Sequence, residues 1–507
     1  MDLTRRTLIS SVAVAAGALA APPAFELEEA TLAELQRRMT AGSLTAHALT
    51  QAYLDRIAAI DKRGPALNSV IELNPDALSI ATALDAERKA KGARGPLHGI
   101  PVLIKDNIDT ADRMMTTAGS LALRGSIAAR DSVVAGRLRA AGAVLLGKTN
   151  LSEWANYRSS HSTSGWSGRG GLTRNPYALD RNACGSSSGS GAAVSANLCA
   201  LAIGTETDGS IVCPSSTNGV VGIKPTLGLI PATGIIPIAH SQDTAGPMAR
   251  TVADAAIFLG ALTGLDYTTS LDANGLRGAR IGVARDKFFG FSEEGDRVID
   301  AAIAEMKRAG AEIVDPADIP TAGKFDDSES IVLSYEFKND LNLYLGALGP
   351  QAPVHSLADV IAFNDSHRDQ EMLYFGQDLM IKAQGRGPLT SQEYRDALKK
   401  DHQLARTEGI DAVMAKYRLD ALVAPTAGPA WCTDLINGDH APGGSSTPAA
   451  VAGYPNINVP AGFAFGLPVG ISFFGAANSE ALLIKLAYAF EQATRHRRPP
   501  KFLPRIS

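Results

Sequence analysis

The sequence predicts an α/β protein in which a mixed or parallel β-sheet is covered by helices. Three observations support this class. Helices and strands alternate along the chain, the strands are short apolar runs, and neither a repeat nor a flexible linker interrupts residues 25–507. Apolar runs of this kind are typical of strands that helices bury on both faces. With 507 residues and 45% hydrophobic content, the chain is long enough for one large domain.

The elements follow from the hydrophobic pattern. Apolar residues at helical spacing predict an amphipathic helix over 43–60. Residues 159–191 are rich in Ser, Gly and Asn, and so long a polar stretch inside a compact domain predicts a functional loop. The remaining predicted elements, in order, are helix 76–91, strand 99–104 ending at Lys105, helix 131–141, strand 143–146, helix 192–198, strand 200–204, helix 210–216, strand 280–284 and helix 294–309.

The first 21 residues have the pattern of an export signal. Arg5 and Arg6 precede an apolar run over 8–21, which is too short and too rich in alanine for a membrane span. An Ala-x-Ala sequence at 18–20 offers a cleavage site. Because paired arginines resemble a twin-arginine signal, we expect residues 1–21 to be removed and the mature protein to be periplasmic. An uncleaved membrane anchor is the alternative.

Composition excludes several classes of partner. The 48 Lys and Arg residues against 52 Asp and Glu give a net charge of -4, which provides no attraction for nucleic acid or anionic lipid. Four cysteines are too few and too scattered for a disulfide scaffold or a zinc cluster, and no metal-binding motif occurs. We therefore expect no metal, no cofactor, no nucleic-acid partner and no stable membrane association, and we expect a monomer.

Two short sequences match known functional motifs but lack the structural context that those motifs need. Residues 142–149 fit the P-loop pattern, but the residues between the glycine and Lys148 are apolar and favour a buried strand. Residues 185–189 fit the G-x-S-x-G nucleophile elbow of α/β-hydrolases, with Ser187 as nucleophile. An elbow follows directly on a buried strand, whereas the residues before this one are polar. No histidine stands in a setting that suggests a partner for Ser187.

A third interpretation takes this serine loop with its neighbours. GIPVLIKDN at 99–107, CGSSSGSG at 184–191 and GTETDGSI at 204–211 resemble, in sequence and in order, the motifs of the amidase signature family. The resemblance covers about 30–260 and resumes at 421–426 and 453–460. It implies one large α/β domain with a mixed central sheet, and a catalytic triad of two serines and a lysine.

The resemblance assigns Lys105 as the base, Ser210 as the nucleophile and Ser186, 24 residues before it, as the serine that bridges them. It also implies a cis peptide bond before Ser186. Elementary chemistry agrees, because a serine hydroxyl needs a base and a lysine can act as one only when burial keeps it neutral. The alternative for Lys105 is a surface residue paired with Asp106.

Amide cleavage also needs hydrogen-bond donors for the tetrahedral oxyanion. The resemblance implies that backbone N–H groups at Thr207, Asp208, Gly209 and Ser210 provide them. Many family members have glycine where this chain has Asp208. A carboxylate facing the oxyanion would be unfavourable, so we expect the Asp208 side chain to point away and to cap the following helix.

The sequences at 184–191 and 205–214 look most like those of bacterial peptide amidases, and the export signal fits a periplasmic enzyme that acts on peptides. We therefore expect hydrolysis of C-terminal peptide amides through an acyl-enzyme, with release of ammonia. The alternatives are an acylamidase for aryl or fatty amides, an α/β-hydrolase-type serine esterase, and a relative that binds peptides without catalytic activity. Substrate selection is expected in residues 266–420. Five aromatic residues there could line a cleft or belong to the core: Tyr335, Phe337, Tyr344, Tyr374 and Phe375.

Overall fold

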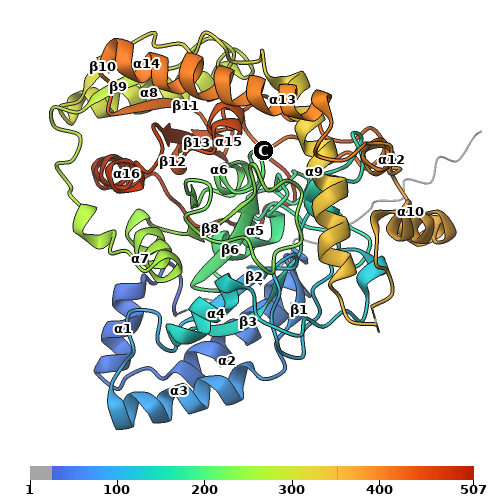
Figure 1. Ribbon diagram of the computed structural model, residues 1–507. Coiled ribbons are helices and arrows are strands. Elements are labelled where there is room, and N and C mark those ends of the chain that lie inside the picture. Colours follow the sequence, from blue (N-terminus) through green and yellow to red (C-terminus); the bar gives the residue numbers. More distant parts are fainter. Residues whose placement is uncertain (1–25, 351, 507) are drawn as a thin grey trace, which may run out of the picture.

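An 11-stranded mixed sheet runs through the protein in the computed structural model, which describes residues 26–350 and 352–506 (Figure 1). The predicted export signal lies outside these described residues. The strands are β1 (Val70–Leu73), β2 (Pro101–Lys105), β3 (Val144–Thr149), β6 (Leu201–Glu206), β7 (Val221–Lys224), β8 (Thr244–Ala249), β9 (Arg280–Val283), β10 (Glu312–Val314), β11 (Ala421–Pro425), β12 (Asn456–Ala464) and β13 (Leu467–Phe474). Their spatial order is β1-β3-β2-β6-β8-β7-β12-β13-β11-β9-β10.

Helices surround this sheet. They are α1 (Leu32–Thr40), α2 (Ala46–Arg56), α3 (Ala77–Lys91), α4 (Val133–Ala140), α5 (Ser188–Ser195), α6 (Val212–Thr217), α7 (Val252–Thr263), α8 (Glu293–Arg308), α9 (Asp326–Gly346), α10 (Leu357–Ser366), α11 (Arg368–Glu371), α12 (Asp378–Gln384), α13 (Gln392–His402), α14 (Asp411–Tyr417), α15 (Thr447–Ala452) and α16 (Glu480–Thr494). A separate hairpin pairs β4 (Trp166–Ser167) with β5 (Gly171–Leu172). This mixed α/β architecture confirms the predicted fold class.

Strand direction decides where the chemistry can gather. Strand β2 runs parallel to both β3 and β6, with Ile104 opposite Ile203 on β6. The carboxyl ends of β2 and β6 therefore lie at the same edge of the sheet, and such edges are where open α/β sheets bind ligands. Lys105 ends β2, and the GTETDGSI segment leaves β6 at Glu206. Two of the three resembling motifs meet there because of this parallel pairing.

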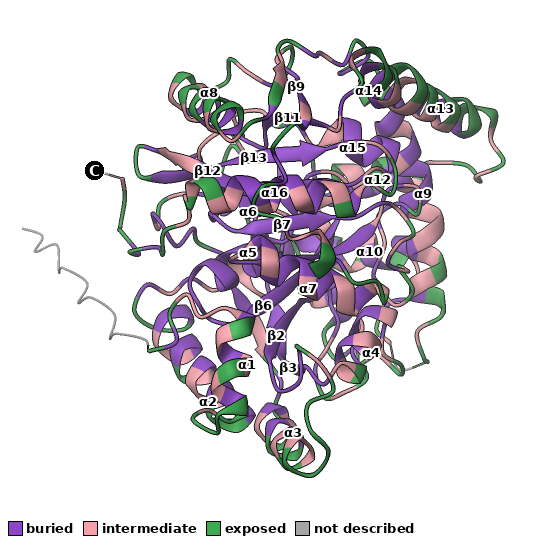
Figure 2. Cartoon of the chain, turned by 90° about the vertical axis from the view of Figure 1, so that its left-hand side faces the viewer, coloured by how far each residue is buried: buried purple, intermediate pink, exposed green. Residues whose placement is uncertain are grey.

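The helix that follows the polar loop is buried in the centre of the protein. All residues of α5 are buried, and they are small: Ser, Gly, Ala and one Val. Small side chains let this helix approach β6, β2 and β3 closely. Helices α7 and α16 lie on the opposite face of the sheet from α5 (Figures 1 and 2). Exposed residues are concentrated on the outer helices (Figure 2).

Most predicted elements match the observed ones to within a few residues. The predicted helix over 43–60 ends its regular turns at Arg56 and continues as a π-helical segment over Ile57–Asp61. The polar stretch 159–191 contains the β4–β5 hairpin and the first half of α5. Part of the 266–420 region extends the sheet edge through β9 and β10, and α9 to α13 follow. Within the described residues, no helix has the length and apolar character needed to cross a membrane.

Candidate active site

Lys105 lies fully buried at the end of β2. Its Nζ is 2.8 Å from both Ser186 Oγ and Thr205 Oγ1, and 3.1 Å from Ser187 Oγ. Burial lowers the pKa of Lys105 to about 7, against the opposing effect of the carboxylates of Asp243 and Glu206. An amine with this pKa is largely neutral just above pH 7, so it can accept a proton from a hydroxyl group.

Ser186 is also fully buried, in the turn before α5. The Gly185–Ser186 peptide bond is cis, as the family resemblance implies. Its neighbour Ser187 has a different environment, because its hydroxyl donates to the carbonyl oxygen of Thr205 at 3.0 Å. In the described chain no histidine forms a hydrogen bond with Ser187, and no strand leads directly into it, because the preceding strand, β5, ends at Leu172. These contacts disfavour the nucleophile-elbow interpretation.

Ser210 lies in the short connection between the end of β6 and the start of α6. It follows Gly209, whose φ of +76° is a conformation that favours glycine. Ser210 is 8% exposed whereas Lys105 and Ser186 are 0% exposed, so Ser210 is the member of the three that solvent can reach. The Ser210 carbonyl accepts the Ser187 N–H at 3.2 Å, which ties the two serine segments together. The structure brings the three predicted residues to one place, without a side-chain hydrogen bond between Ser186 and Ser210.

The backbone before Ser210 has free donors. In the described structure the N–H groups of all four predicted donors, Thr207, Asp208, Gly209 and Ser210, donate no hydrogen bond. The next two N–H groups, of Ile211 and Val212, both donate to Glu206 Oε2, at 2.7 and 3.0 Å. Unpaired backbone donors in such a sheltered position are rare in folded proteins. They can receive a ligand oxygen that carries negative charge.

The expectation that Asp208 caps the following helix is wrong. Glu206 caps α6, because its longer side chain reaches the N–H groups of Ile211 and Val212 from the end of β6. Asp208 instead reaches α15, where its Oδ2 accepts from Thr447 Oγ1 at 2.7 Å. Burial raises the pKa of the Asp208 carboxyl, and its Oδ1 has no hydrogen-bond partner among the described residues.

A disulfide joins the two serine segments. Cys184, two residues before Ser186, pairs with Cys213, three residues after Ser210, and their Cα atoms are 6.0 Å apart. Cys199 and Cys432 are free. The sequence left the redox state of the cysteines open, because four scattered cysteines do not specify a pairing. The available signal was that two of them stand within three residues of the assigned serines.

The region after β7 supplies further residues that sequence reasoning missed. Thr207 Oγ1 donates to Asp243 Oδ1 at 2.5 Å, and Asp243 Oδ2 accepts the N–H groups of Ile238 and Ala239. Burial raises the pKa of Asp243 to about 7. A small cavity lies beside this contact, lined by Asn107, Ala155, Thr205, Thr207, Ile235, Ile236, Ile238, Asp243 and Thr244. Asp243 thus links Thr207 to the segment that enters β8.

The P-loop match is a buried strand, as the apolar residues indicate. Residues 144–149 form β3, and every residue of it is buried. Lys148 points inward, where its Nζ donates to the carbonyl oxygen of Ile108 at 2.6 Å and to Thr116 Oγ1 at 2.9 Å. A lysine with these partners is not available to bind a phosphate group.

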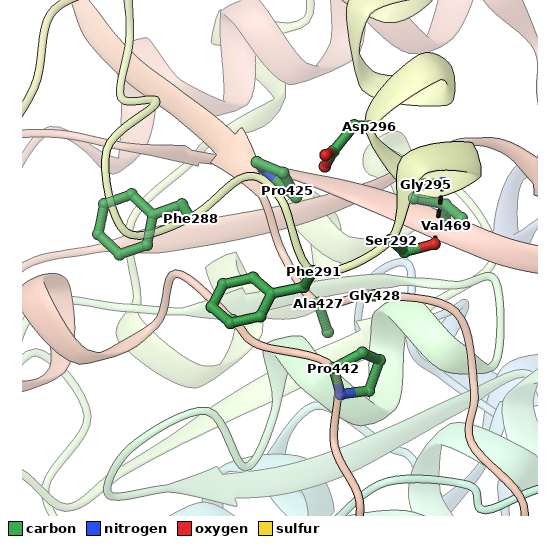
Figure 3. A pocket seen from close by; sticks show the side chains of 11 residues that line it. Phe288, Phe291, Ser292, Gly295, Asp296, Pro425, Ala427, Gly428, Pro442 and Val469 are labelled. Carbon is green, nitrogen blue, oxygen red and sulfur yellow. Dashed lines mark hydrogen bonds between the residues drawn. The ribbon is translucent and has the colours of Figure 1, made fainter.

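A pocket beside β11 contains none of the predicted site residues (Figure 3). Its lining is mostly apolar or glycine: Phe288, Phe291, Ser292, Gly295, Asp296, Pro425, Ala427, Gly428, Pro442, Gly444 and Val469. Its two polar side chains are engaged in local structure. Ser292 Oγ accepts the Gly295 N–H as the N-cap of α8, and Asp296 accepts the Gly290 N–H. This pocket therefore offers no evident catalytic chemistry.

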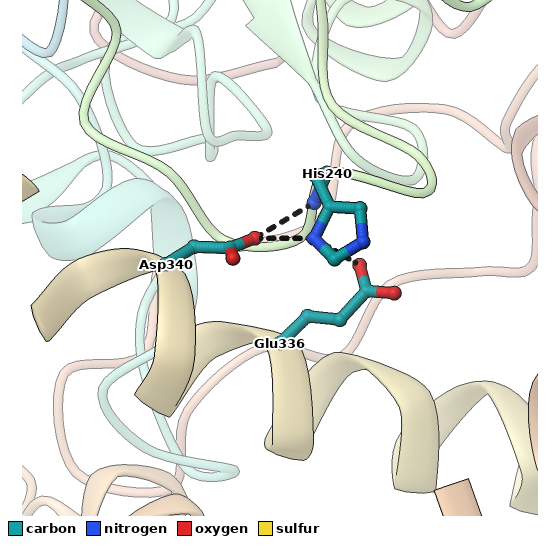
Figure 4. Close-up of side chains that lie close together, drawn as sticks. All are labelled: His240, Glu336 and Asp340. Atoms are coloured by element: carbon teal, nitrogen blue, oxygen red, sulfur yellow. Dashed lines mark hydrogen bonds and ion pairs between the residues drawn. The ribbon is translucent and has the colours of Figure 1, made fainter. Parts of the chain in front are cut away.

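A histidine and two carboxylates meet between α9 and the loop before β8, a cluster that the sequence did not predict (Figure 4). His240 Nδ1 is 2.8 Å from Asp340 and 3.4 Å from Glu336. The hydrogen bond to Asp340 raises the pKa of His240. Each carboxylate is already occupied, because Glu336 accepts from Tyr394 and from the Ser241 N–H, and Asp340 accepts the His240 N–H. These contacts describe an ion pair that joins α9 to the loop before β8.

The aromatic residues of the 266–420 region fall into two groups. Phe337 and Tyr335 are buried in hydrophobic clusters and belong to the core. Tyr374 is 42% exposed and packs edge-on against Trp166 of the polar loop, with ring centroids 5.7 Å apart. Phe375 packs against the same ring at 5.2 Å. This contact brings the 266–420 region against the loop that carries the predicted bridging serine.

Comparison with known proteins gives a consistent result. The Amidase family model matches residues 48–484. A protein from Arabidopsis thaliana described as a "probable amidase" is 42% identical, with 94% of this chain and 93% of the relative covered. The solved structure of native peptide amidase from Stenotrophomonas maltophilia is 53% identical, with 94% of this chain and 100% of that chain covered and a TM-score of 0.90. The solved structure of an amidase family protein from Bacillus anthracis is 38% identical, with 94% and 93% covered and a TM-score of 0.85.

Proposed function

The chain belongs to the amidase family and is an amide-hydrolysing enzyme, and we propose that it acts through Ser210, Ser186 and Lys105. The observation that carries this proposal is the buried amine of Lys105, 2.8 Å from Ser186 Oγ and with its pKa lowered to about 7. Such an amine can serve as a base without a histidine.

The proposed reaction has two halves. The Ser210 oxygen attacks the amide carbon while its proton passes through the Ser186 hydroxyl to Lys105. The tetrahedral intermediate then collapses, the C–N bond breaks, and the nitrogen leaves as ammonia after taking that proton back. Water attacks the resulting ester by the same relay in reverse, which releases the carboxylic acid and restores Ser210. The Ser210 side chain must turn toward Ser186 for the first proton transfer.

The unpaired N–H groups of Asp208, Gly209 and Ser210 are proposed as the donors for the oxyanion. Thr207 contributes by holding the start of this segment through its contact with Asp243. Donors fixed before the reaction stabilise the developing charge without reorganisation, and loss of one such donor typically costs on the order of 10²–10³ in rate.

We propose the C-terminal amides of peptides as substrates. Support comes from the 53% identity, over nearly the whole chain, to the peptide amidase of Stenotrophomonas maltophilia. The test measures ammonia release from a peptide amide, an aryl amide and a fatty amide at equal concentrations. The proposal predicts the largest kcat/KM for the peptide amide. A larger value for the aryl or fatty amide would instead identify an acylamidase.

We further propose that the protein is exported. The twin-arginine pattern at residues 1–21 supports this, and so does the Cys184–Cys213 disulfide, because disulfides persist in oxidising compartments and are rare in the cytosol. Fractionation of the native host should recover the protein in the periplasm, without the signal. Full-length protein confined to the cytosol would overturn this proposal.

A further inference from the structure

Helix α9 contacts the loop before β8 through three of its carboxylates. Asp340 accepts the N–H of His240, Glu336 accepts the N–H of Ser241 at 2.9 Å, and Glu329 accepts from the Gln242 side chain. These contacts attach residues 240–242 to a helix of the 266–420 region, and Figure 4 shows His240 with Glu336 and Asp340. The loop itself borders the segment that carries the free backbone donors.

Gln242 connects this helix to the free-donor segment. The side chain is 2% exposed, and its Nε2 donates to Glu329 Oε1 at 2.9 Å and to the Thr207 carbonyl oxygen at 3.2 Å. An amide nitrogen carries two hydrogens, so both are used. With both hydrogens of this buried amide paired, one orientation is favoured, because leaving either hydrogen unpaired costs free energy.

The contact at the Thr207 carbonyl fixes the direction of the next donor. The Thr207–Asp208 peptide bond is trans, since the described structure has cis bonds only at Gly185–Ser186 and Asp315–Pro316. In a trans peptide the C=O and the following N–H point in opposite directions. A carbonyl held on the Gln242 side therefore turns the Asp208 N–H to the other side, and that N–H is one of the unpaired donors of this segment.

Thr207 is held at a second point. Its hydroxyl donates to Asp243, the residue next to Gln242, at 2.5 Å. Rotation of the Thr207–Asp208 peptide plane would break the Gln242 contact while the Thr207 side chain stayed anchored. The carbonyl contact is thus the one that specifies the orientation of the plane.

We propose that Gln242, supported by Glu329 of α9, is a positioning residue that aims the Asp208 N–H at the oxyanion. This inference rests on the proposed function and adds to it Gln242, together with its contact to Glu329 of the 266–420 region. Among the described residues, the Gln242 side chain donates to Thr207 and Glu329 and forms no hydrogen bond with Lys105, Ser186 or Ser210. Its effect reaches the reaction only through the Thr207–Asp208 peptide.

The experiment replaces Gln242 by Met, which has similar volume and no donor. A misdirected oxyanion donor should lower kcat by about 10- to 100-fold, less than full loss of a donor, and leave KM for a peptide amide within about twofold. A peptide trifluoromethyl ketone, whose carbonyl forms an oxyanion adduct with a serine, should bind more weakly by a similar factor. A merely structural defect would not lower kcat and the affinity for this inhibitor by similar factors while KM stays constant.

The matched control is Asn74→Leu, which removes another buried amide; its partner, the carbonyl oxygen of Leu145, lies near the amino end of β3, at the opposite edge of the sheet from Lys105. It should leave kcat and inhibitor affinity unchanged. If Gln242→Met unfolds the enzyme, Glu329→Met becomes the deciding variant, with kcat expected to fall at constant KM. Unchanged kcat in the folded variant, or a fall without weaker inhibitor binding, overturns the inference.

Failure of the proposed function has a different signature in the same assay. If Ser210→Ala releases ammonia as fast as the unmodified enzyme, Ser210 is not the nucleophile and the inference fails with that proposal. If Ser210→Ala is inactive while Gln242→Met behaves like the unmodified enzyme, only the role of Gln242 is refuted.

Discussion

The lysine base predicts an alkaline-going limb in the pH profile. An ordinary lysine has a pKa near 10.5, whereas burial lowers the pKa of Lys105 to about 7. At pH 7 about half of the buried amine is neutral, against roughly one in 3,000 for an ordinary lysine, and the difference corresponds to about 5 kcal/mol. Protonation removes the base, so kcat/KM should fall about tenfold per pH unit below 7 and level off above about pH 8.

The assay is the initial rate of ammonia release from a peptide amide between pH 5 and pH 9. Lys105→Ala should lose most of the rate and the limb together. Lys105→Arg should be no better, because a guanidinium stays charged over this range. A Lys105→Ala enzyme with near-native rate and the same pH profile would refute the assignment and show that another group is the base.

Three further predictions follow from neighbouring contacts. Asp243→Asn removes a carboxylate that raises the pKa of Lys105, so the limb should move to lower pH; a shift to higher pH would contradict this sign. Replacing Cys184 and Cys213 by Ser removes a link across 29 residues and should lower the free energy of unfolding by about 3–4 kcal/mol in denaturant titrations, while Cys432→Ser should change nothing. Activity should survive prolonged EDTA treatment, and loss that zinc restores would reject the serine mechanism.

Local sequence was enough to predict the main elements and the residues that gather at the site. The apolar run before Lys105 predicts a buried strand end, and burial is what makes its amine a usable base. Three motifs in a fixed order assigned Ser186 and Ser210, and the structure brings both segments to Lys105. The burial of Lys105 follows from residues close together in the chain, whereas the two serines were assigned by the resemblance to the amidase signature family.

Contacts between distant segments were beyond sequence reasoning. The capping of α6 depended on side-chain reach, since Glu206 at the end of β6 is longer and better placed than Asp208. Gln242 contacts Thr207 across 35 residues and Glu329 across 87. No local pattern encodes such pairs, and a buried glutamine in a loop has no distinctive sequence signal. The same holds for the order of the strands in the sheet.

The central claim is that Ser210 is the nucleophile of an amide-hydrolysing enzyme. The most direct measurement is ammonia release from a peptide amide by the unmodified enzyme, Ser210→Ala and Ser187→Ala, each checked for folding by its thermal midpoint. We expect Ser210→Ala to be folded and inactive and Ser187→Ala to lose activity only modestly. An active Ser210→Ala beside an inactive Ser187→Ala would contradict this claim and establish the nucleophile-elbow interpretation.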